Sequence, residues 1–221
     1  MPVPLVLASA SPARLSTLRS AGIEPTVIVA DIDEDGLLAN ARDLFSEHRS
    51  AGLGPELVLR DQPFIVASAK AEWVQEHNNP DALILGCDSM LEFRGELLGK
   101  PGSPEVARDL WHKVREQSAI LHTAHALIDN RIDSRDAQAG EVRVGDTSST
   151  IVRFADLTDA EIDAYVATGE PLGVAGGFTI DGLGGPFIEG IDGDHHGVIG
   201  LSLPLLRRLL IRLGLSITDL W

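Results

Sequence analysis

Asp88 is the residue of this sequence best placed to carry out chemistry. It follows a short apolar run at residues 82–85, which predicts a buried strand. Ligands of parallel-type sheets bind at the carboxyl ends of strands, where a carboxylate can hold a divalent metal or accept a proton from water. The alternative is a capping aspartate in a turn, and the sequence Gly86-Cys87-Asp88-Ser89 is compatible with both interpretations.

The first loop of the chain combines the parts that an anion site needs. Residues 5–8 are apolar, and a helical pattern then runs from Pro12 to Gly22. Ser11 can cap this helix, Pro12 suits its first position, and Gly22 suits its end. Hydroxyls, free backbone N–H groups and the cation of Arg14 would surround the helix start, an environment that anions favour. Taken alone, the loop is more typical of an ordinary capped connection.

Lysine is scarce in the chain, which holds only Lys70, Lys100 and Lys113. A flexible ammonium suits a point contact with phosphate, although a solvated surface position is the usual state of a lysine. An acidic run occupies residues 31–35. Most of it is expected in solvent, but one inward carboxylate would complete an oxygen-ligand site for magnesium or manganese with Asp88.

Two other patterns suggest different chemistry. Cys87 could act as the nucleophile of a cysteine hydrolase, with a base from among His122, His125, His195 and His196. The apolar run before Cys87 predicts a buried, inert thiol instead. Residues 192–196 (Asp-Gly-Asp-His-His) lack the oxygen spacing of a calcium loop and the convergent His and Cys of a zinc site, so we interpret them as a turn.

Composition limits the classes of partner. The 221 residues suffice for one large domain or two small lobes, and 18 Lys and Arg against 33 Asp and Glu give a net charge of −15. This charge argues against binding to a nucleic-acid polymer or an anionic membrane, but a few cations and a metal could still hold a small anion. The single cysteine fits a reducing cytosol. The N-terminal apolar run is short and has no positive residue before it, so we do not expect a signal peptide.

Strand-like and helical segments alternate along the chain, which favours an α/β fold. The predicted strands and hairpins lie at residues 26–32, 82–85, 91–98, 119–128 and 147–154, and the predicted helices at 64–77, 103–115, 158–168 and 203–213. Ser103 can cap the second of these helices, and Thr158 with Glu161 resembles a capping box at the start of the third. In the helix at 64–77, Ile65, Ala69 and Trp73 predict an apolar stripe, with Lys70 on a different side.

Together these segments resemble the Maf family of nucleoside triphosphate pyrophosphatases, part of the inosine-triphosphatase-like fold group. The resemblance covers nearly the whole chain in order, and each motif is modest alone. The motifs are Leu7-Ala-Ser-Ala-Ser-Pro-Ala-Arg14, Asp31-Ile-Asp-Glu34, Ala69-Lys-Ala71, Leu85-Gly-Cys-Asp-Ser89, Leu98-Gly-Lys-Pro101, His122-Thr-Ala124, Tyr165-Val-Ala-Thr-Gly-Glu-Pro-Leu172, the glycine-rich residues 175–185, and Ile199-Gly-Leu-Ser-Leu-Pro204.

The resemblance implies that Glu34 and Asp88 hold a divalent Mg²⁺ or Mn²⁺ ion and that Asp88 is also the base that activates water. The implied reaction cuts a nucleoside triphosphate between its α- and β-phosphates, giving a nucleoside monophosphate and pyrophosphate. The substrates would be non-standard or selected nucleotides, as for a house-cleaning enzyme, which removes such nucleotides. The residues implied to contact the phosphates are Ser9, Arg14, Lys70 and Lys100.

Two positions depart from the family pattern. The family commonly has two consecutive Arg after Ser-Pro, whereas this chain has Ala13 and then Arg14. The family uses Gln or Glu in the glycine-rich segment to read the base, and the corresponding residue here is Asp181. Ala13, Ser89 and Asp181 match positions associated with substrate choice, and the preferred base stays open.

By the resemblance, the fold is expected to be α/β, with a mixed, twisted sheet flanked by helices and two lobes around a central cleft. We treat residues 1–221 as a single domain whose lobes do not fold independently. The family pattern is compatible with a homodimer and a cytoplasmic location. It assigns no role to residues 36–63 and 129–146. The alternative function is a nucleotide-binding regulator of cell division without significant turnover. The only observation that suggests it is Ala13, which replaces an arginine of the family pattern.

Overall fold

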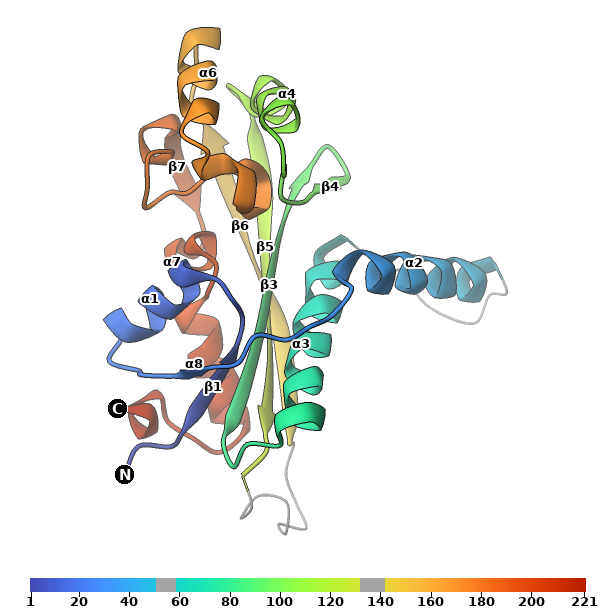
Figure 1. Cartoon of the computed structure of the whole chain (residues 1–221), viewed down its shortest axis with the longest axis vertical. Coiled ribbons are helices and arrows are strands. Elements are labelled where there is room, and N and C mark those ends of the chain that lie inside the picture. The colour runs from blue at the N-terminus through green and yellow to red at the C-terminus, as the bar shows by residue number, and fades with distance from the viewer. Residues whose placement is uncertain (51–58, 132–141) are drawn as a thin grey trace. The chain divides into compact units, whose positions relative to one another are not determined.

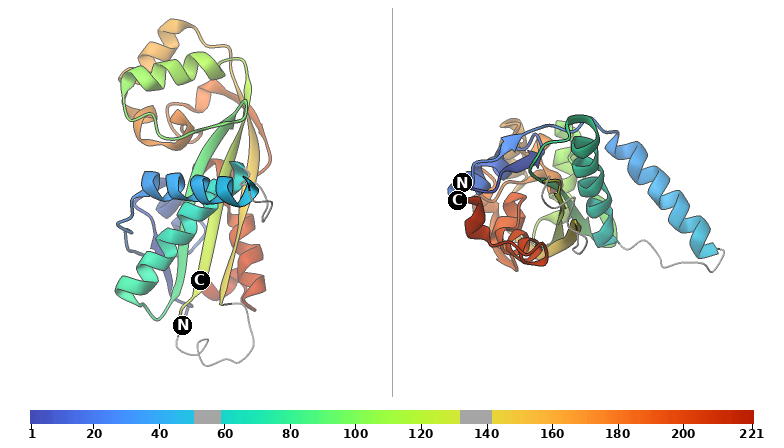
Figure 2. Two further views of the ribbon diagram at one scale, coloured as in Figure 1. Left: turned by 90° about the vertical axis from the view of Figure 1, so that its right-hand side faces the viewer. Right: turned by 90° about the horizontal axis from the view of Figure 1, so that it is seen from below.

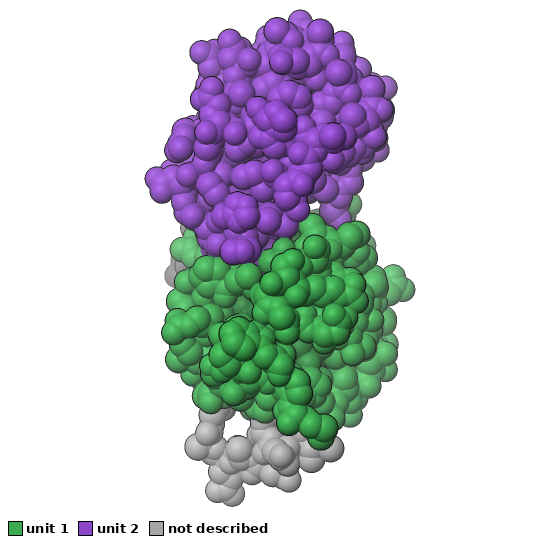
Figure 3. All heavy atoms as spheres, turned by 90° about the vertical axis from the view of Figure 1, so that its left-hand side faces the viewer, with its two compact units in different colours: residues 1–88, 124–147, 203–221 green, residues 89–123, 148–202 purple. Residues whose placement is uncertain are grey.

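The computed structural model describes the backbone of residues 1–50, 59–131 and 142–221, and the side chains of these residues except 44–50. The chain forms two compact units (Figure 3). Unit 1 comprises residues 1–88, 124–147 and 203–221, and unit 2 comprises residues 89–123 and 148–202. Each unit draws on separate stretches of the chain. That the units do not fold independently stays a prediction.

A seven-stranded mixed sheet runs through the structure and is flanked by helices, which confirms the predicted fold class (Figure 1). Its strand order is β2-β1-β3-β5-β6-β7, and β4 pairs with β3. β1 is parallel to β2 and β3, whereas the β3–β4 and β6–β7 pairs are antiparallel. The strands are β1 Leu5–Ala8, β2 Thr26–Val27, β3 Leu83–Phe93, β4 Glu96–Leu98, β5 Ser118–Asp129, β6 Arg143–Phe154 and β7 Ile188–Asp192.

Three helices begin at the caps that the sequence predicts. Ser11 accepts a hydrogen bond from the Arg14 N–H, Ser103 accepts one from the Val106 N–H, and Thr158 forms a capping box with Glu161. No helix in the described part of the chain is long and apolar enough to span a membrane. The α-helices are α1 Pro12–Ser20, α2 Glu34–Ser50, α3 Gln62–Asn78, α4 Pro104–Val114, α6 Asp159–Ala167, α7 His195–Ile199 and α8 Leu203–Arg212, with short 3₁₀ turns at Leu59–Asp61, Glu170–Gly173, Ala175–Gly177, Gly185–Phe187 and Ile217–Leu220.

In unit 1, α3 and α8 cover opposite faces of the sheet (Figures 1 and 2). The residues of α3 that pack on the strands are small or β-branched, as in Ala67, Ala71 and Val74, and they form one core with Val6 and Ile84. The predicted stripe of Ile65, Ala69 and Trp73 is wrong, because these three side chains are only partly buried. Lys70 instead lies on the buried face.

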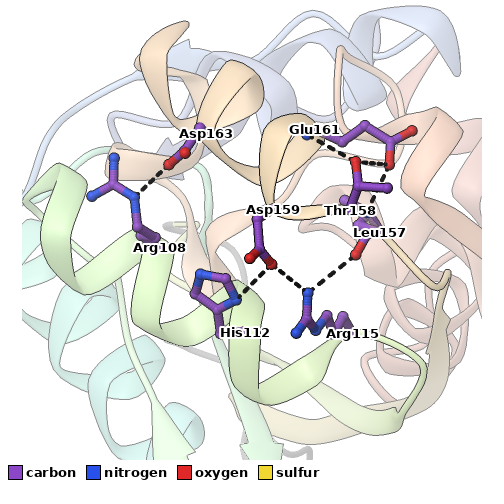
Figure 4. A network of polar contacts seen from close by, with 8 residues as sticks. All are labelled: Arg108, His112, Arg115, Leu157, Thr158, Asp159, Glu161 and Asp163. Atoms are coloured by element: carbon purple, nitrogen blue, oxygen red, sulfur yellow. Dashed lines mark hydrogen bonds and ion pairs between the residues drawn. The ribbon is translucent and has the colours of Figure 1, made fainter.

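Unit 2 has its own core around Trp111, which is fully buried and makes edge-on contacts with Phe154, Tyr165 and Phe187. The indole N–H donates to the Gly177 carbonyl at 2.9 Å. On the surface of this unit, exposed ion pairs link the α4 segment to α6 (Figure 4). Arg108 bonds Asp163, and Arg115 bonds Asp159, each at 2.6 Å. Such exposed pairs contribute little to stability, so the aromatic core holds the unit together.

Two predicted strands have different lengths in the structure. β3 does not end before Asp88 but continues to Phe93, where it pairs with β4 across the turn at Arg94 and Gly95. Asp88 therefore lies inside a strand rather than at its carboxyl end. β2, predicted over residues 26–32, contains only Thr26 and Val27, which pair with Val6 and Leu7 of β1.

Gly86 sets how closely α3 approaches β3. A Cβ at this position would overlap the backbone carbonyl oxygen of Ala67 and lie 3.1 Å from the Ala71 Cβ. Backbone cannot move aside as a flexible side chain can. The absence of a side chain at Gly86 therefore brings α3 down onto the strand that carries Asp88.

We predict that Gly86→Ala lowers the free energy of unfolding by about 2 kcal/mol or more, because overpacking a close backbone contact forces the helix away from the strand. Urea titration measures this change. Gly173→Ala is the matched control, since Gly173 has no neighbour within 4 Å of its Cβ position and no positive φ. Equal stability of the two variants would contradict the packing argument.

Candidate active site

Lys70 joins two carboxylates in unit 1. Its Nζ lies 2.7 Å from Glu34 Oε1 and 2.9 Å from Asp88 Oδ1. Lys70 and Asp88 are both buried, while Glu34 is half-buried at the start of α2. The three residues come from α2, α3 and β3, so the fold brings together three charges that are far apart in the sequence.

Burial changes the chemistry of Asp88. Removal from water raises the pKa of its carboxyl group, while the positive charges of Lys70 and Arg14 oppose the increase without cancelling it. A carboxylate with a raised pKa accepts a proton more readily than an exposed one. Asp88 therefore has the environment of a general base.

The first loop lies against the strand that carries Asp88. β1 and β3 are parallel, with Ala8 opposite Gly86, so Ser9 follows β1 beside Cys87. The Arg14 guanidinium donates to the Cys87 carbonyl at 2.7 Å and to the Ser9 hydroxyl at 3.0 Å. These contacts hold a buried cation and a hydroxyl at the start of α1, next to the residue that precedes Asp88.

Two contacts that the sequence analysis did not anticipate hold α2, the helix that begins at Glu34. The Asp33 carboxylate accepts from the Gly36 N–H at 3.0 Å at the beginning of α2. Farther along α2, the guanidinium of Arg42 donates twice to the side-chain oxygen of Gln62, at 2.8 and 3.1 Å, and so ties α2 to the first turn of α3. The sequence gives no local signal for the Arg42–Gln62 contact, because its partners lie on separate helices.

The environment of Cys87 argues against a cysteine hydrolase. The side chain is fully buried, and desolvation raises the pKa of its thiol to about 12 despite the nearby cations. A thiol with this pKa is almost entirely protonated at neutral pH and is a poor nucleophile. Of the suggested bases, His122 lies in unit 2, where its two ring nitrogens contact Ser149 and Glu92, each at 2.8 Å.

Glu34 and Asp88 have the right chemistry to hold a divalent metal. Their oxygens approach one shared ammonium, so the fold already directs both carboxylates toward a single cation. Mg²⁺ commonly takes one or two carboxylates and completes its shell with water and substrate phosphates. No group of three or more His, Cys, Asp or Glu that could hold a metal occurs among the described residues.

The other residues predicted for the site have surroundings of their own. Ala13 is half-buried in α1, and its carbonyl accepts from the Thr17 hydroxyl at 3.0 Å. Lys100 and Asp181 are exposed in unit 2, and the Ser89 hydroxyl, also in unit 2, lies 3.0 Å from that of Thr123. The substrate contacts expected of Ala13, Ser89, Lys100 and Asp181 stay predictions.

Comparison with known families settles the ancestry of the chain. The profile of the family described as "Maf-like protein" matches residues 4–213, which include every residue of the candidate site. The chain belongs to the Maf family.

Several Maf relatives are close in sequence and length. Proteins named nucleoside triphosphate pyrophosphatase from Saccharopolyspora erythraea and Streptomyces avermitilis are each 49% identical, over 98% of this chain and 96% and 94% of their own. The similarly named protein of Mycolicibacterium gilvum is 47% identical over 98% of this chain and 97% of its own. Among solved structures, the Staphylococcus aureus Ham1 protein aligns with a TM-score of 0.39 and 14% identity, over 69% of this chain and 72% of its own.

The sequence analysis missed the part played by Glu170, although it lies within one of the Maf motifs. Its carboxylate accepts from the hydroxyls of Tyr165 and Thr179 and, at 3.1 Å, from the backbone N–H groups of Leu183 and Gly184. These bonds fold the glycine-rich segment that contains Asp181 around one anion. The signal in the sequence was a lone glutamate before a proline, which is too common to be specific.

We predict that Glu170→Gln lowers the free energy of unfolding by about 1–3 kcal/mol at pH 7, because an amide replaces a carboxylate that accepts four hydrogen bonds. Burial raises the pKa of Glu170, but the hydrogen bonds from Thr179, Leu183, Tyr165 and Gly184 together lower it below its ordinary value. The wild-type advantage is therefore full above the unfolded-state pKa of about 4.3 and disappears as pH falls through the lower folded-state value.

Urea unfolding at pH 7 and at pH 3 or below measures this difference. Glu189→Gln, at an exposed position on β7, is the control. A Glu170→Gln deficit that is the same at every pH would contradict the assignment of a stabilised carboxylate.

Proposed function

We propose that this Maf protein hydrolyses nucleoside triphosphates between the α- and β-phosphates in a reaction that requires Mg²⁺ or Mn²⁺. The observation that carries the proposal is the meeting of Glu34 and Asp88 on one cation, with the Arg14–Ser9 pair held beside the same strand. The relatives establish the general class, a hydrolase named nucleoside triphosphate pyrophosphatase. The metal, the base and the choice of substrate belong to the proposal.

In the proposed reaction Asp88 accepts a proton from a water molecule as the water oxygen bonds to the α-phosphorus. The bond from the α-phosphorus to the oxygen that bridges it to the β-phosphorus breaks, and its electron pair leaves with pyrophosphate. The raised pKa of Asp88 favours the proton transfer. Water thus supplies the oxygen that the monophosphate gains.

Cations are needed because the protein and its substrate are both negative. At a net charge of −15 the protein would repel a triphosphate unless local positive groups face it. A metal held by Glu34 and Asp88 would neutralise phosphate oxygens and polarise the phosphorus. Arg14 and Ser9 would bind phosphate in unit 1, and Lys70 and Lys100 would supply further positive charge.

Substrate choice is assigned to positions outside the ion cluster. Ala13, Ser89 and Asp181 would select the base, in favour of non-standard or particular nucleotides. We place the enzyme in the cytoplasm, where its substrates occur, with no role for a nucleic-acid polymer or a membrane. A homodimer remains part of this proposal.

We predict that Asp88→Asn lowers the rate of pyrophosphate release by about 10²–10⁴-fold, because the amide cannot accept the proton of water. A panel of nucleoside triphosphates with Mg²⁺ or Mn²⁺, assayed for pyrophosphate and orthophosphate, measures the effect. Circular dichroism shows whether the fold is intact, and Asp109→Asn, at an exposed position of α4, is the control.

Orthophosphate as the sole product of the wild-type protein would contradict the proposal. Nucleotide binding without any product, unchanged by Asp88→Asn, would favour the nucleotide-binding regulator instead.

A further inference from the structure

The Lys70 ammonium occupies a position in which a second cation could not easily join it. Its side chain is 10% exposed, as is that of Asp88, and its Nζ is within 2.9 Å of both carboxylate oxygens. Its neighbours on the buried face of α3 are Ala67 and Ala71, which offer no polar group to a displaced charge. The ammonium therefore depends on Glu34 and Asp88 for its partners among the described contacts.

Lys70 in turn is a positive partner of both carboxylates. A charge buried without a partner costs several kcal/mol, and two neighbouring carboxylates also repel each other. Lys70 reduces both costs without any bound ion. However, Glu34 and Asp88 are also the residues that the proposed function assigns to the metal, so both cations would compete for the same oxygens.

We propose that Lys70 is an internal substitute for the divalent metal, which neutralises Glu34 and Asp88 until metal and nucleotide arrive together. This inference rests on the proposed function. When a metal binds, the ammonium must leave at least one carboxylate, because two cations so close repel each other strongly at low dielectric. A triphosphate offers the displaced ammonium new oxygen partners.

Metal and nucleotide binding would then be coupled through one side chain. When metal binds alone, Lys70 loses a partner, and this lowers the affinity for the metal. When metal binds with a phosphate chain, phosphate oxygens replace that partner and the affinity is not lowered. By linkage, each ligand strengthens the binding of the other. The protein would hold metal weakly when no nucleotide is present and so would not retain it between turnovers.

We predict that Lys70→Met in the full-length protein binds Mn²⁺ at least about tenfold more tightly than wild type without nucleotide, because methionine keeps the apolar stem and removes the competing charge. Electron paramagnetic resonance of free Mn²⁺ measures the affinity directly. Lys113→Met is the matched control, since Lys113 is exposed on α4, and its affinity should equal that of wild type.

Thermal unfolding provides a second readout of the same competition. Metal-free Lys70→Met should melt below wild type, and Mn²⁺ should raise its melting temperature by more than it raises that of wild type. Mn²⁺ affinity of Lys70→Met equal to or weaker than that of wild type, together with an equal rise in melting temperature, would overturn the inference.

A measurement on the wild-type protein covers the case in which Lys70→Met does not fold. Pyrophosphate, as a minimal phosphate chain, should tighten Mn²⁺ binding to the protein after correction for Mn²⁺–pyrophosphate complexes in solution. Absence of any such coupling would overturn the inference. The inference alone fails if wild type hydrolyses a triphosphate to pyrophosphate, while Lys70→Met does not bind Mn²⁺ more tightly and pyrophosphate does not tighten Mn²⁺ binding to wild type. If the Lys70→Met effect appears but no triphosphate is hydrolysed, the proposed function fails instead.

Discussion

The ion pairs from Lys70 to Glu34 and Asp88 are the interaction on which the candidate site depends. Burying a lysine or an aspartate without a partner costs free energy, so the Lys70 ammonium and the carboxylate oxygens have to lie at hydrogen-bond distance, as they do at 2.7 and 2.9 Å. Gly86 makes this possible because it lets α3 lie against β3 with no side chain between them. The close packing of α3 on β3 at Gly86 is therefore also what brings Lys70 to Asp88.

The same strand links this cluster to the first loop of the chain. Parallel pairing of β1 with β3 brings Ser9 and Arg14 beside Cys87. The Cys87 carbonyl, one residue before Asp88, then accepts a hydrogen bond from the Arg14 guanidinium and fixes it. Unit 2 has a comparable arrangement, in which the Glu170 carboxylate accepts hydrogen bonds from backbone N–H groups and side-chain hydroxyls. In both units a single charged group organises a segment that lacks long regular structure.

Local signals in the sequence predicted local structure well. The caps at Ser11, Ser103 and Thr158 involve atoms within three residues, and all three are found as predicted. The buried side of α3 has apolar residues at helical spacing, including Val66, Ala71 and Val74, but Lys70 interrupts the pattern. Lys70 belongs to this side because of its partners on α2 and β3, which no local spacing reveals. The continuation of β3 past Asp88 has a similar cause: its outer residues pair with β4.

The measurement that tests the account most directly is hydrolysis of a nucleoside triphosphate in water enriched in ¹⁸O, followed by mass spectrometry of both products. If Asp88 directs water to the α-phosphorus, one ¹⁸O atom appears in the nucleoside monophosphate and the pyrophosphate stays unlabelled. Label in the pyrophosphate would mean attack on the β-phosphorus and would contradict the account.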